Sequence, residues 1–275
     1  MTAPRRVQIG VDLTYACNYQ CPYCVLPPVV KHRGVEEWVA AFERVRSRHG
    51  SSHINLSGGE PSIYPGFYEL VRALVRHHVV DLCTNLSWPV EKLIPALSPG
   101  RLLISPTFHP TQVGFDDFLE RLRFVRPYVT RRDPSGRPSV NFVCDPPQMG
   151  RMAEHRERLE RAGFSLLPLP LMVEGALSNT DEEKESITDA SPFHGAADPR
   201  LDFQLGLQSP RGRLCGAGAI YALVRGDGNV DRCSRYKGGA LGNFFSEDFR
   251  LGDGPTPCSQ DWCPYESAFL MEAMF

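Results

Sequence analysis

Three cysteines near the N-terminus, Cys17, Cys21 and Cys24, lie in one short segment with the spacing Cys-x3-Cys-x2-Cys. Three thiolates can bind three irons of a cubane iron–sulfur cluster and leave one iron open for a ligand that is not protein. A structural zinc site is the alternative, but zinc normally has four ligands in paired groups, and no pair follows this segment closely. The spacing therefore predicts an iron–sulfur centre with a position open for chemistry.

The composition limits the partners and the compartment. The 275 residues carry a net charge of −2, which provides no electrostatic footprint for nucleic acid or for an anionic membrane. Residues 1–13 lack the apolar stretch of a signal peptide, and no segment is long enough to span a bilayer. We therefore expect a cytoplasmic protein without a nucleic-acid or membrane partner, in which the nine cysteines bind metal or catalyse rather than form disulfides.

Strand-like segments alternate with amphipathic helices between residues 7 and 173. This alternation implies a parallel sheet with right-handed crossovers, in an α/β domain. The predicted strands cover residues 7–13, 53–56, 79–83, 101–105, 139–144 and 164–173. The predicted helices cover residues 35–49, which Gly50 can cap, and residues 67–75, 89–97, 115–126 and 150–162.

Residues suited to chemistry follow directly after several of these strands. Ligands of parallel α/β sheets bind at the carboxyl ends of the strands, so we expect these loops to face one site. The loops are the cysteine segment and residues 58–60, 84–85, 105–109 and 144–145.

The composition of the sequence changes after residue 173. Residues 174–204 are polar, with an acidic run at 181–185, and are expected to be a linker on the surface. Residues 205–275 are rich in glycine, and they contain a predicted hairpin at 219–233 with its turn at 226–229. A short terminal helix is predicted at 266–275.

The segment CNYQCPYC, with Tyr23 before the third cysteine, and the segment Ser57–Pro61 (SGGEP) resemble the radical S-adenosylmethionine (SAM) superfamily. The resemblance covers roughly residues 5–173 and implies a partial (β/α)6 barrel. It also implies a 4Fe–4S cluster whose open iron binds the amino and carboxylate groups of SAM. Electrons from an external donor such as flavodoxin or ferredoxin would then drive cleavage of SAM to a 5′-deoxyadenosyl radical, which abstracts hydrogen from the substrate.

The residue types and the resemblance together imply roles for individual residues. Gly58 and Gly59 would let the backbone approach a ligand closely, and Glu60 could accept a hydrogen bond from the SAM ammonium group. The resemblance further implies that the backbone near Tyr23 meets the adenine. It places Asn85 and Ser105 near the methionine or ribose, although Asn85 also suits an ordinary turn.

The C-terminal cysteines Cys215, Cys233, Cys258 and Cys263 resemble the SPASM and twitch extensions of this superfamily. The resemblance implies a second, auxiliary 4Fe–4S cluster in a twitch-like domain, which could take up the electron left on a substrate radical. The Cys-x4-Cys spacing of the last pair departs from the tighter pair common in twitch domains. A four-cysteine zinc site is the alternative.

Two further residues are candidates for catalysis. Cys144 could donate a hydrogen atom to a substrate radical, and it is preferred over Cys83 because Asp145 and two prolines follow it. His109 could bind substrate or move a proton. A small buried apolar residue is the alternative for each cysteine, and a structural histidine is the alternative for His109.

The sequence therefore predicts a radical SAM barrel at residues 1–173, a linker at 174–204 and a twitch-like domain at 205–275. The reaction expected first is dehydrogenation of a small polar molecule such as a sugar or aminocyclitol. An epimerase with a cysteine hydrogen donor and a maturase of a ribosomal peptide are the alternatives. The maturase is the less favoured of these because the first strand starts within ten residues of Met1, and we expect little room for a peptide-recognition domain there. A non-catalytic iron–sulfur or zinc module is a distant alternative.

Overall fold

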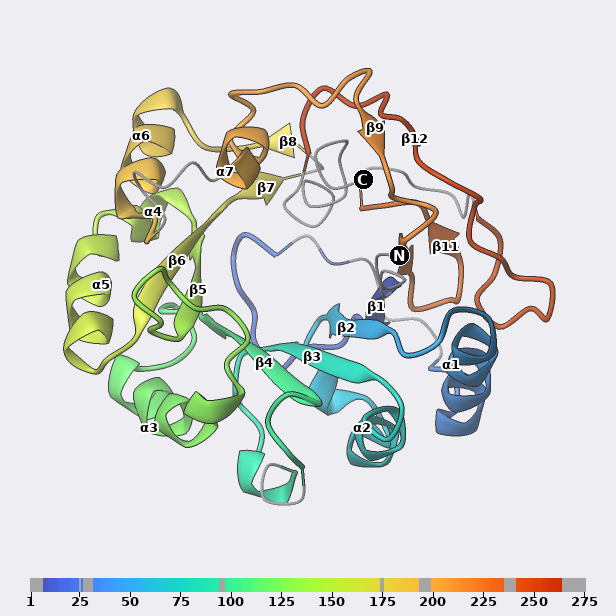
Figure 1. Cartoon of the computed structure of the whole chain (residues 1–275). Coiled ribbons are helices and arrows are strands. Elements are labelled where there is room, and N and C mark those ends of the chain that lie inside the picture. Colours follow the sequence, from blue (N-terminus) through green and yellow to red (C-terminus); the bar gives the residue numbers. More distant parts are fainter. Residues whose placement is uncertain are drawn as a thin grey trace.

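The computed structural model of the chain, shown in Figure 1, has a curved parallel sheet with helices on its outer side. The structure describes residues 7–24, 26, 32–93, 97–173, 176–192, 199–234 and 241–263. The predicted terminal helix at 266–275 lies outside these residues.

All six predicted strands are present, and they pair in chain order through parallel ladders. Because the sheet curves without closing, it forms the partial barrel that the family resemblance implies (Figure 1). The strands are β1 (Gln8–Thr14), β2 (His53–Gly58), β3 (Val79–Thr84), β4 (Leu102–Phe108), β5 (Ser139–Cys144) and β6 (Ser165–Pro170).

The helices that follow the strands lie on the outer face of the sheet (Figure 1). The backbone N–H of Gly34 donates to Glu37 at the start of the first helix, and Gly50, with φ 75°, ends it as predicted. These outer helices are α1 (Val35–His49), α2 (Phe67–Leu74), α3 (Phe115–Val125) and α5 (Met152–Arg161), which the single turn α4 (Pro146–Met149) precedes.

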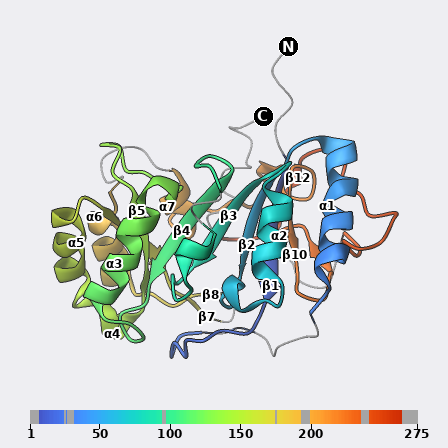
Figure 2. The same ribbon diagram turned by 90° about the horizontal axis from the view of Figure 1, so that it is seen from below.

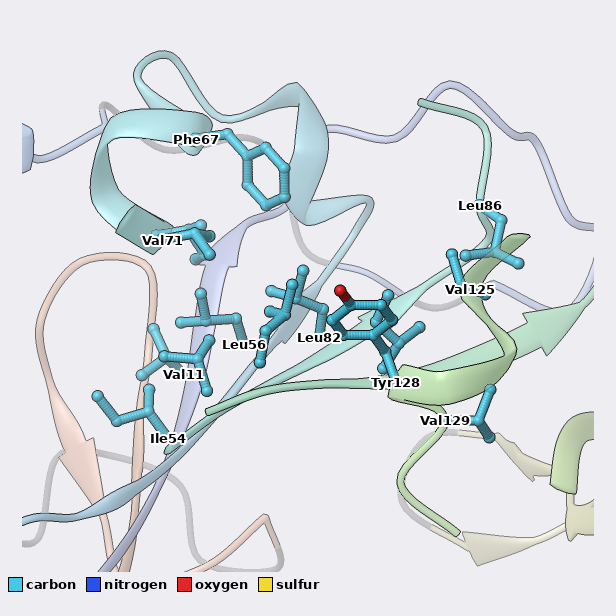
Figure 3. Packing of buried hydrophobic residues seen from close by; sticks show 14 of the residues in the cluster. Val11, Ile54, Leu56, Phe67, Val71, Leu82, Leu86, Val125, Tyr128 and Val129 are labelled. Carbon is cyan, nitrogen blue, oxygen red and sulfur yellow. The ribbon is translucent and has the colours of Figure 1, made fainter. Parts of the chain in front are cut away.

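The core lies between the sheet and these helices. Figure 3 shows Ile54, Leu56 and Leu82 beside Phe67 and Val71 of α2, and all five are buried. Burial of a large aliphatic side chain stabilises a fold by about 1.5–3 kcal/mol. Side chains alternate between the two faces of a strand, so the residues between these positions face the inside of the barrel. This alternation decides which side chains can reach a site there.

The predicted helix at 89–97 is wrong for the residues that the structure describes. Only a 3-10 turn, η2 (Val90–Lys92), forms there, and residues 94–96 lie outside the described part. Prolines at 89, 95 and 99 remove backbone donors that a longer helix would need. The 150–162 prediction is confirmed except at its start, because α5 begins at Met152.

The segment expected to be a surface linker contains regular structure. A small hairpin, β7 (Met172–Val173) with β8 (Ala176–Leu177), is followed by α6 (Asp181–Ala190) and α7 (Pro199–Gln204). Thr180 and Glu183 form a capping box at the start of α6, and Ile187 is completely buried. The acidic run is thus the exposed first turn of a helix that packs against β6.

The predicted C-terminal hairpin is present as β10 (Tyr221–Val224) and β11 (Val230–Asp231). It extends the barrel sheet, because β10 pairs in parallel with β1 from Gln8 opposite Tyr221 to Val11 opposite Val224. A second pair, β9 (Leu214–Cys215) with β12 (Thr256–Pro257), lies beside it. No helix in the described part of the chain is long and apolar enough to cross a bilayer.

Candidate functional site

A cavity of about 460 Å³ lies at the carboxyl ends of the barrel strands. Figure 2 shows the loop after β1 at the same end of the barrel as β7 and β8. Most of the residues predicted for the site line this cavity, so the expected convergence of the strand ends occurs. Those residues are Cys17, Cys21, Tyr23, Cys24, Gly58, Gly59, Glu60, Asn85 and His109.

Two neighbouring strand ends fix the cysteine segment. The Asn85 amide Nδ2 donates to Asn18 Oδ1 at 3.1 Å. The Gln112 side chain accepts from Gln20 N at 2.9 Å and donates to Gln20 O at 3.2 Å, as an extra strand would. Gln112 lies just before α3 and has no motif around it, so its sequence gives no signal of this role. These contacts hold the segment over the cavity without using any cysteine.

The two glycines allow a close approach of the protein to itself. Gly58 has a φ of 112°, and a Cβ added to it would lie less than 3.0 Å from the carbonyl oxygen of Thr14. A Cβ added to Gly59 would lie less than 3.0 Å from the carbonyl oxygen of Ala16. The N–H of Gly59 donates to Thr14 O at 2.7 Å. We expected these glycines to make room for a ligand. The room is instead taken by the backbone that leads into the cysteine segment, although both glycines also line the cavity.

Glu60 is almost completely buried, and its carboxylate joins three parts of the site. Oε1 accepts from Thr84 Oγ1 at 2.9 Å and from Ser62 N at 3.2 Å, and Oε2 accepts from Asn85 N at 2.9 Å. Burial raises the pKa of Glu60, and these hydrogen bonds oppose that rise. A carboxylate has about four lone-pair positions, so one more donor can be accommodated.

Asn85 and Ser105, which were predicted to have similar roles, lie in different places. Asn85 lines the cavity and forms the ordinary turn as well, because its Oδ1 accepts from Ser87 N at 2.9 Å. Ser105 is buried away from the cavity lining and donates to Asp81 at 3.0 Å. Thr107, two residues further along β4, lines the cavity instead. Ser105 therefore does not lie in the cavity lining, where a residue near the methionine or ribose of SAM was expected.

His109 contacts the cysteine segment directly. Its Nδ1 lies 2.7 Å from Tyr23 Oη and 3.5 Å from Cys21 Sγ, and the Tyr19 ring packs edge-on against it at 5.8 Å between centroids. Burial lowers the pKa of His109 to about 4, which keeps the imidazole neutral and able to accept a hydrogen bond. This residue supports the cysteine segment and also borders the cavity.

Of the two cysteines considered as hydrogen donors, the structure places Cys83, and not the preferred Cys144, in the lining of the cavity. Cys144 has no exposed surface, does not line the cavity, and has a pKa raised to about 12 by burial. On the same strand, Asn141 and Val143 line the cavity, so alternation turns Cys144 toward the outer core. Cys83 lines the cavity, and its sulfur accepts from Asn55 Nδ2 at 3.4 Å.

The donor set of the cysteine segment suits a cubane cluster. All three thiols line one cavity, and the N–H of Cys24 donates to Cys21 O at 3.0 Å, which curls the segment. Among the described residues, no three His, Cys, Asp or Glu side chains converge as they would around a single ion. In a cubane each thiolate binds a different iron, so such a cluster does not require the three thiols to meet at one ion.

Three of the four C-terminal cysteines pack together. Cys215 and Cys233 share one small buried cluster, and Cys258 packs against it. Cys263 lies in a different cluster with Phe203, which belongs to α7. The predicted four-ligand set is therefore gathered only in part, as three neighbours and one residue elsewhere.

One arginine holds the strands that carry these cysteines. The Arg232 guanidinium donates to the carbonyl of Cys215 at 3.2 Å, of Ala217 at 2.6 Å and of Thr256 at 2.9 Å. Because these carbonyls belong to β9, β12 and the turn after β9, Arg232 takes the place of further ladder bonds.

A second arginine joins the hairpin to the barrel. The Arg225 guanidinium lies 2.7 Å from Asp231 and 3.2 Å from Asp12 of β1. Next to this pair, the N–H of Gly226 donates to Tyr15 Oη at 3.2 Å. Since Asp12 and Tyr15 lead into the cysteine segment, the hairpin holds the backbone on which that segment depends.

Comparison with known proteins agrees with this geometry. Residues 11–129 match the family model described as the Radical SAM superfamily. The chain is 35% identical over 100 residues to a PqqA peptide cyclase of Ruegeria pomeroyi, which covers 35% of this chain and 26% of the relative. It is also 35% identical over 81 residues to the mycofactocin maturase MftC of Mycobacterium ulcerans, covering 27% of this chain and 21% of that protein. The chain thus spans about a quarter of these curated relatives.

Solved structures share the fold at low sequence identity. Streptococcus suis SuiB bound to S-adenosylmethionine is 16% identical, with a TM-score of 0.59, over 89% of this chain and 64% of SuiB. The structure of anSMEcpe with bound AdoMet and the Cp18Cys peptide is 17% identical, with a TM-score of 0.63, over 88% of this chain and 78% of that one.

The fold and the site thus define an α/β protein with a partial barrel and a cysteine segment at the carboxyl ends of its strands. More particularly, residues 11–129 form a radical SAM domain. Its cofactors are a 4Fe–4S cluster and SAM.

Proposed function

We propose that this radical SAM enzyme abstracts a hydrogen atom from a peptide. The observation that carries the proposal is the 35% identity to a PqqA peptide cyclase, in a chain whose cysteine and GGE segments line one cavity. A second relative is named a maturase. The peptide alternative is therefore supported better than the expected dehydrogenation of a sugar or aminocyclitol, and the early position of the first strand has no bearing on it.

In this proposal Cys17, Cys21 and Cys24 hold three irons of the SAM-binding cluster. When bound, the cluster and SAM supply an electron and a 5′-deoxyadenosyl group that removes hydrogen from an unactivated carbon. Electrons come from an external donor protein. The chain's own residues have to bind SAM, orient it and keep water away from the carbon that reacts.

The residues around the cysteine segment divide these tasks. Glu60 fixes the end of β3 and retains one free acceptor position for an ammonium group. Asn85 holds Asn18 and so sets the height of the cysteine segment over the cavity. His109 orients Tyr23 through a 2.7 Å hydrogen bond, which fixes the backbone expected beside the adenine.

We propose further that Cys215, Cys233 and Cys258 contribute to an auxiliary 4Fe–4S cluster. The packing of Cys263 with Phe203 leaves the fourth position to be filled by movement of Cys263 or by a ligand other than cysteine. The division of the chain at 173 and 204 also changes in this proposal, because α6 packs on β6 and so belongs with the barrel. The cluster-bearing part begins after α7.

The test of the proposed function compares two classes of substrate. A lysate of fully deuterated cells is separated into a small-polypeptide fraction and a metabolite fraction, and each is given to the reconstituted enzyme with SAM and a reductant. Deuterium transferred to 5′-deoxyadenosine identifies the class that loses hydrogen. The proposal predicts label from the polypeptide fraction, and label from the metabolite fraction alone would refute it in favour of a small-molecule substrate.

A further inference from the structure

The cavity has an apolar rim made by Leu26, Met172, Leu177 and Trp262. Met172 and Leu177 are cross-strand partners in the β7–β8 hairpin, so their side chains share one face. Met172 is 39% exposed and Leu26 is 36% exposed, so both have apolar surface available to a bound molecule. The rim comes from segments after β6 and after the third cysteine, whereas the residues assigned to SAM come from the ends of β1 to β4.

The described lining of the cavity carries few charged side chains. Among the described residues that line it, none is lysine or arginine, and Glu60 is the only carboxylate. The polar side chains outside the SAM region are also few: Thr107 and Asn141, which lie 3.4 Å apart, and Gln204. A sugar or a phosphorylated molecule would lose more hydrogen bonds to water here than these three side chains could replace. An apolar group would lose nothing and would bury surface.

We propose that the apolar rim binds an aliphatic or aromatic side chain of the substrate, so that the residue held at the reacting position is apolar. This inference rests on the proposed peptide substrate and names the class of residue within it. The C–H bond of that residue breaks homolytically, its hydrogen atom becomes part of 5′-deoxyadenosine, and the unpaired electron stays on the substrate carbon. Burial of one large apolar side chain corresponds to about a 10- to 100-fold gain in binding.

The experiment uses polypeptide fractions in which one residue type carries deuterium. Cells are grown with deuterated leucine, valine, phenylalanine or tyrosine for one set, and with deuterated serine, aspartate or lysine for the other. We expect deuterium in 5′-deoxyadenosine from the first set. Label from the second set alone would overturn the inference and leave the peptide function standing. Label from neither set, together with label from the fully deuterated polypeptide fraction, would overturn the inference alone. No label from the fully deuterated fraction either would overturn the peptide function and the inference together.

Matched variants test the rim itself. Met172→Lys places a charge on the rim, and Phe124→Lys places the same charge on α3 at a side chain that is 48% exposed and outside the cavity. We expect KM for the active polypeptide fraction to rise by about 10- to 100-fold in the first variant, and to be unchanged in the second. Met172→Leu, which keeps the apolar surface, should retain the normal KM. Equal KM values for Met172→Lys and Phe124→Lys would refute a role for the rim, provided both variants unfold at the wild-type temperature.

Discussion

Replacement of Arg225 by methionine should release the C-terminal hairpin from the barrel. The guanidinium lies between Asp12 and Asp231, whose side chains are 16% and 2% exposed, so the variant leaves both carboxylates without this cation. Removal of one partner from a buried ion pair costs about 3–5 kcal/mol. Arg225 is 26% exposed, and burial already raises the pKa of Asp12, so water and protonation relieve part of this cost. We expect about 2–4 kcal/mol.

This loss should appear locally, because β10 contacts the sheet through one neighbour on the barrel side, β1. Amide hydrogen exchange measured by mass spectrometry should quicken over Tyr221–Val224 by about 30- to 1000-fold, since 1.4 kcal/mol is a factor of ten. The peptide that covers Val79–Thr84 in the middle of the sheet serves as the internal control.

A second variant separates the charge effect from lost packing. Arg225→Met combined with Asp12→Asn and Asp231→Asn removes the cation and both carboxylates, so it should recover much of the protection that the single variant loses. Unchanged exchange at β10 in the single variant would refute the reasoning. A combined variant no better protected than the single one would assign the effect to packing instead.

Three further outcomes follow from the geometry. Gly59→Ala should lower the iron bound after reconstitution by at least half, because its Cβ would lie less than 3.0 Å from a carbonyl oxygen, whereas Gly150→Ala, with nothing within 4 Å, should bind iron normally. Cys83→Ser should change the product or the partition of deuterium from solvent into it, whereas Cys144→Ser should not, since only Cys83 lines the cavity. Burial lowers the pKa of His78 to about 4 in the folded state. Between pH 6.5 and 4 the imidazole is therefore protonated in the unfolded state and neutral in the folded state. The free energy of unfolding should therefore fall by up to about 1.4 kcal/mol per pH unit from pH 6.5 toward 4, and His78→Asn should flatten that fall in thermal denaturation.

The strands and most helices could be predicted because each has a local period. Parallel pairing then brings the carboxyl ends of the strands together, so the position of the cavity and most of its lining residues could be predicted from the sequence. The same reasoning could have separated the two cysteines. Cys144 shares its strand face with Val140 and Phe142, and Cys83 shares its face with Asp81.

Contacts between distant segments could not be predicted in this way. Nothing in the sequence of the hairpin shows that β10 pairs with β1, because such pairing depends on the whole chain. The contact of Gln112 with Gln20 is equally non-local. The helix α6 was missed for another reason. Its polar composition hid a capping box at Thr180 and Glu183 that the sequence did contain.

The central claim is that Cys17, Cys21 and Cys24 form the centre that cleaves SAM. The most direct test is anaerobic reconstitution with iron and sulfide, followed by SAM and dithionite, with 5′-deoxyadenosine as the readout. We predict that the wild-type chain and Cys144→Ser produce it, and that replacement of the three cysteines by alanine abolishes it. No 5′-deoxyadenosine from the wild-type chain, or an undiminished yield from the triple variant, would contradict the account.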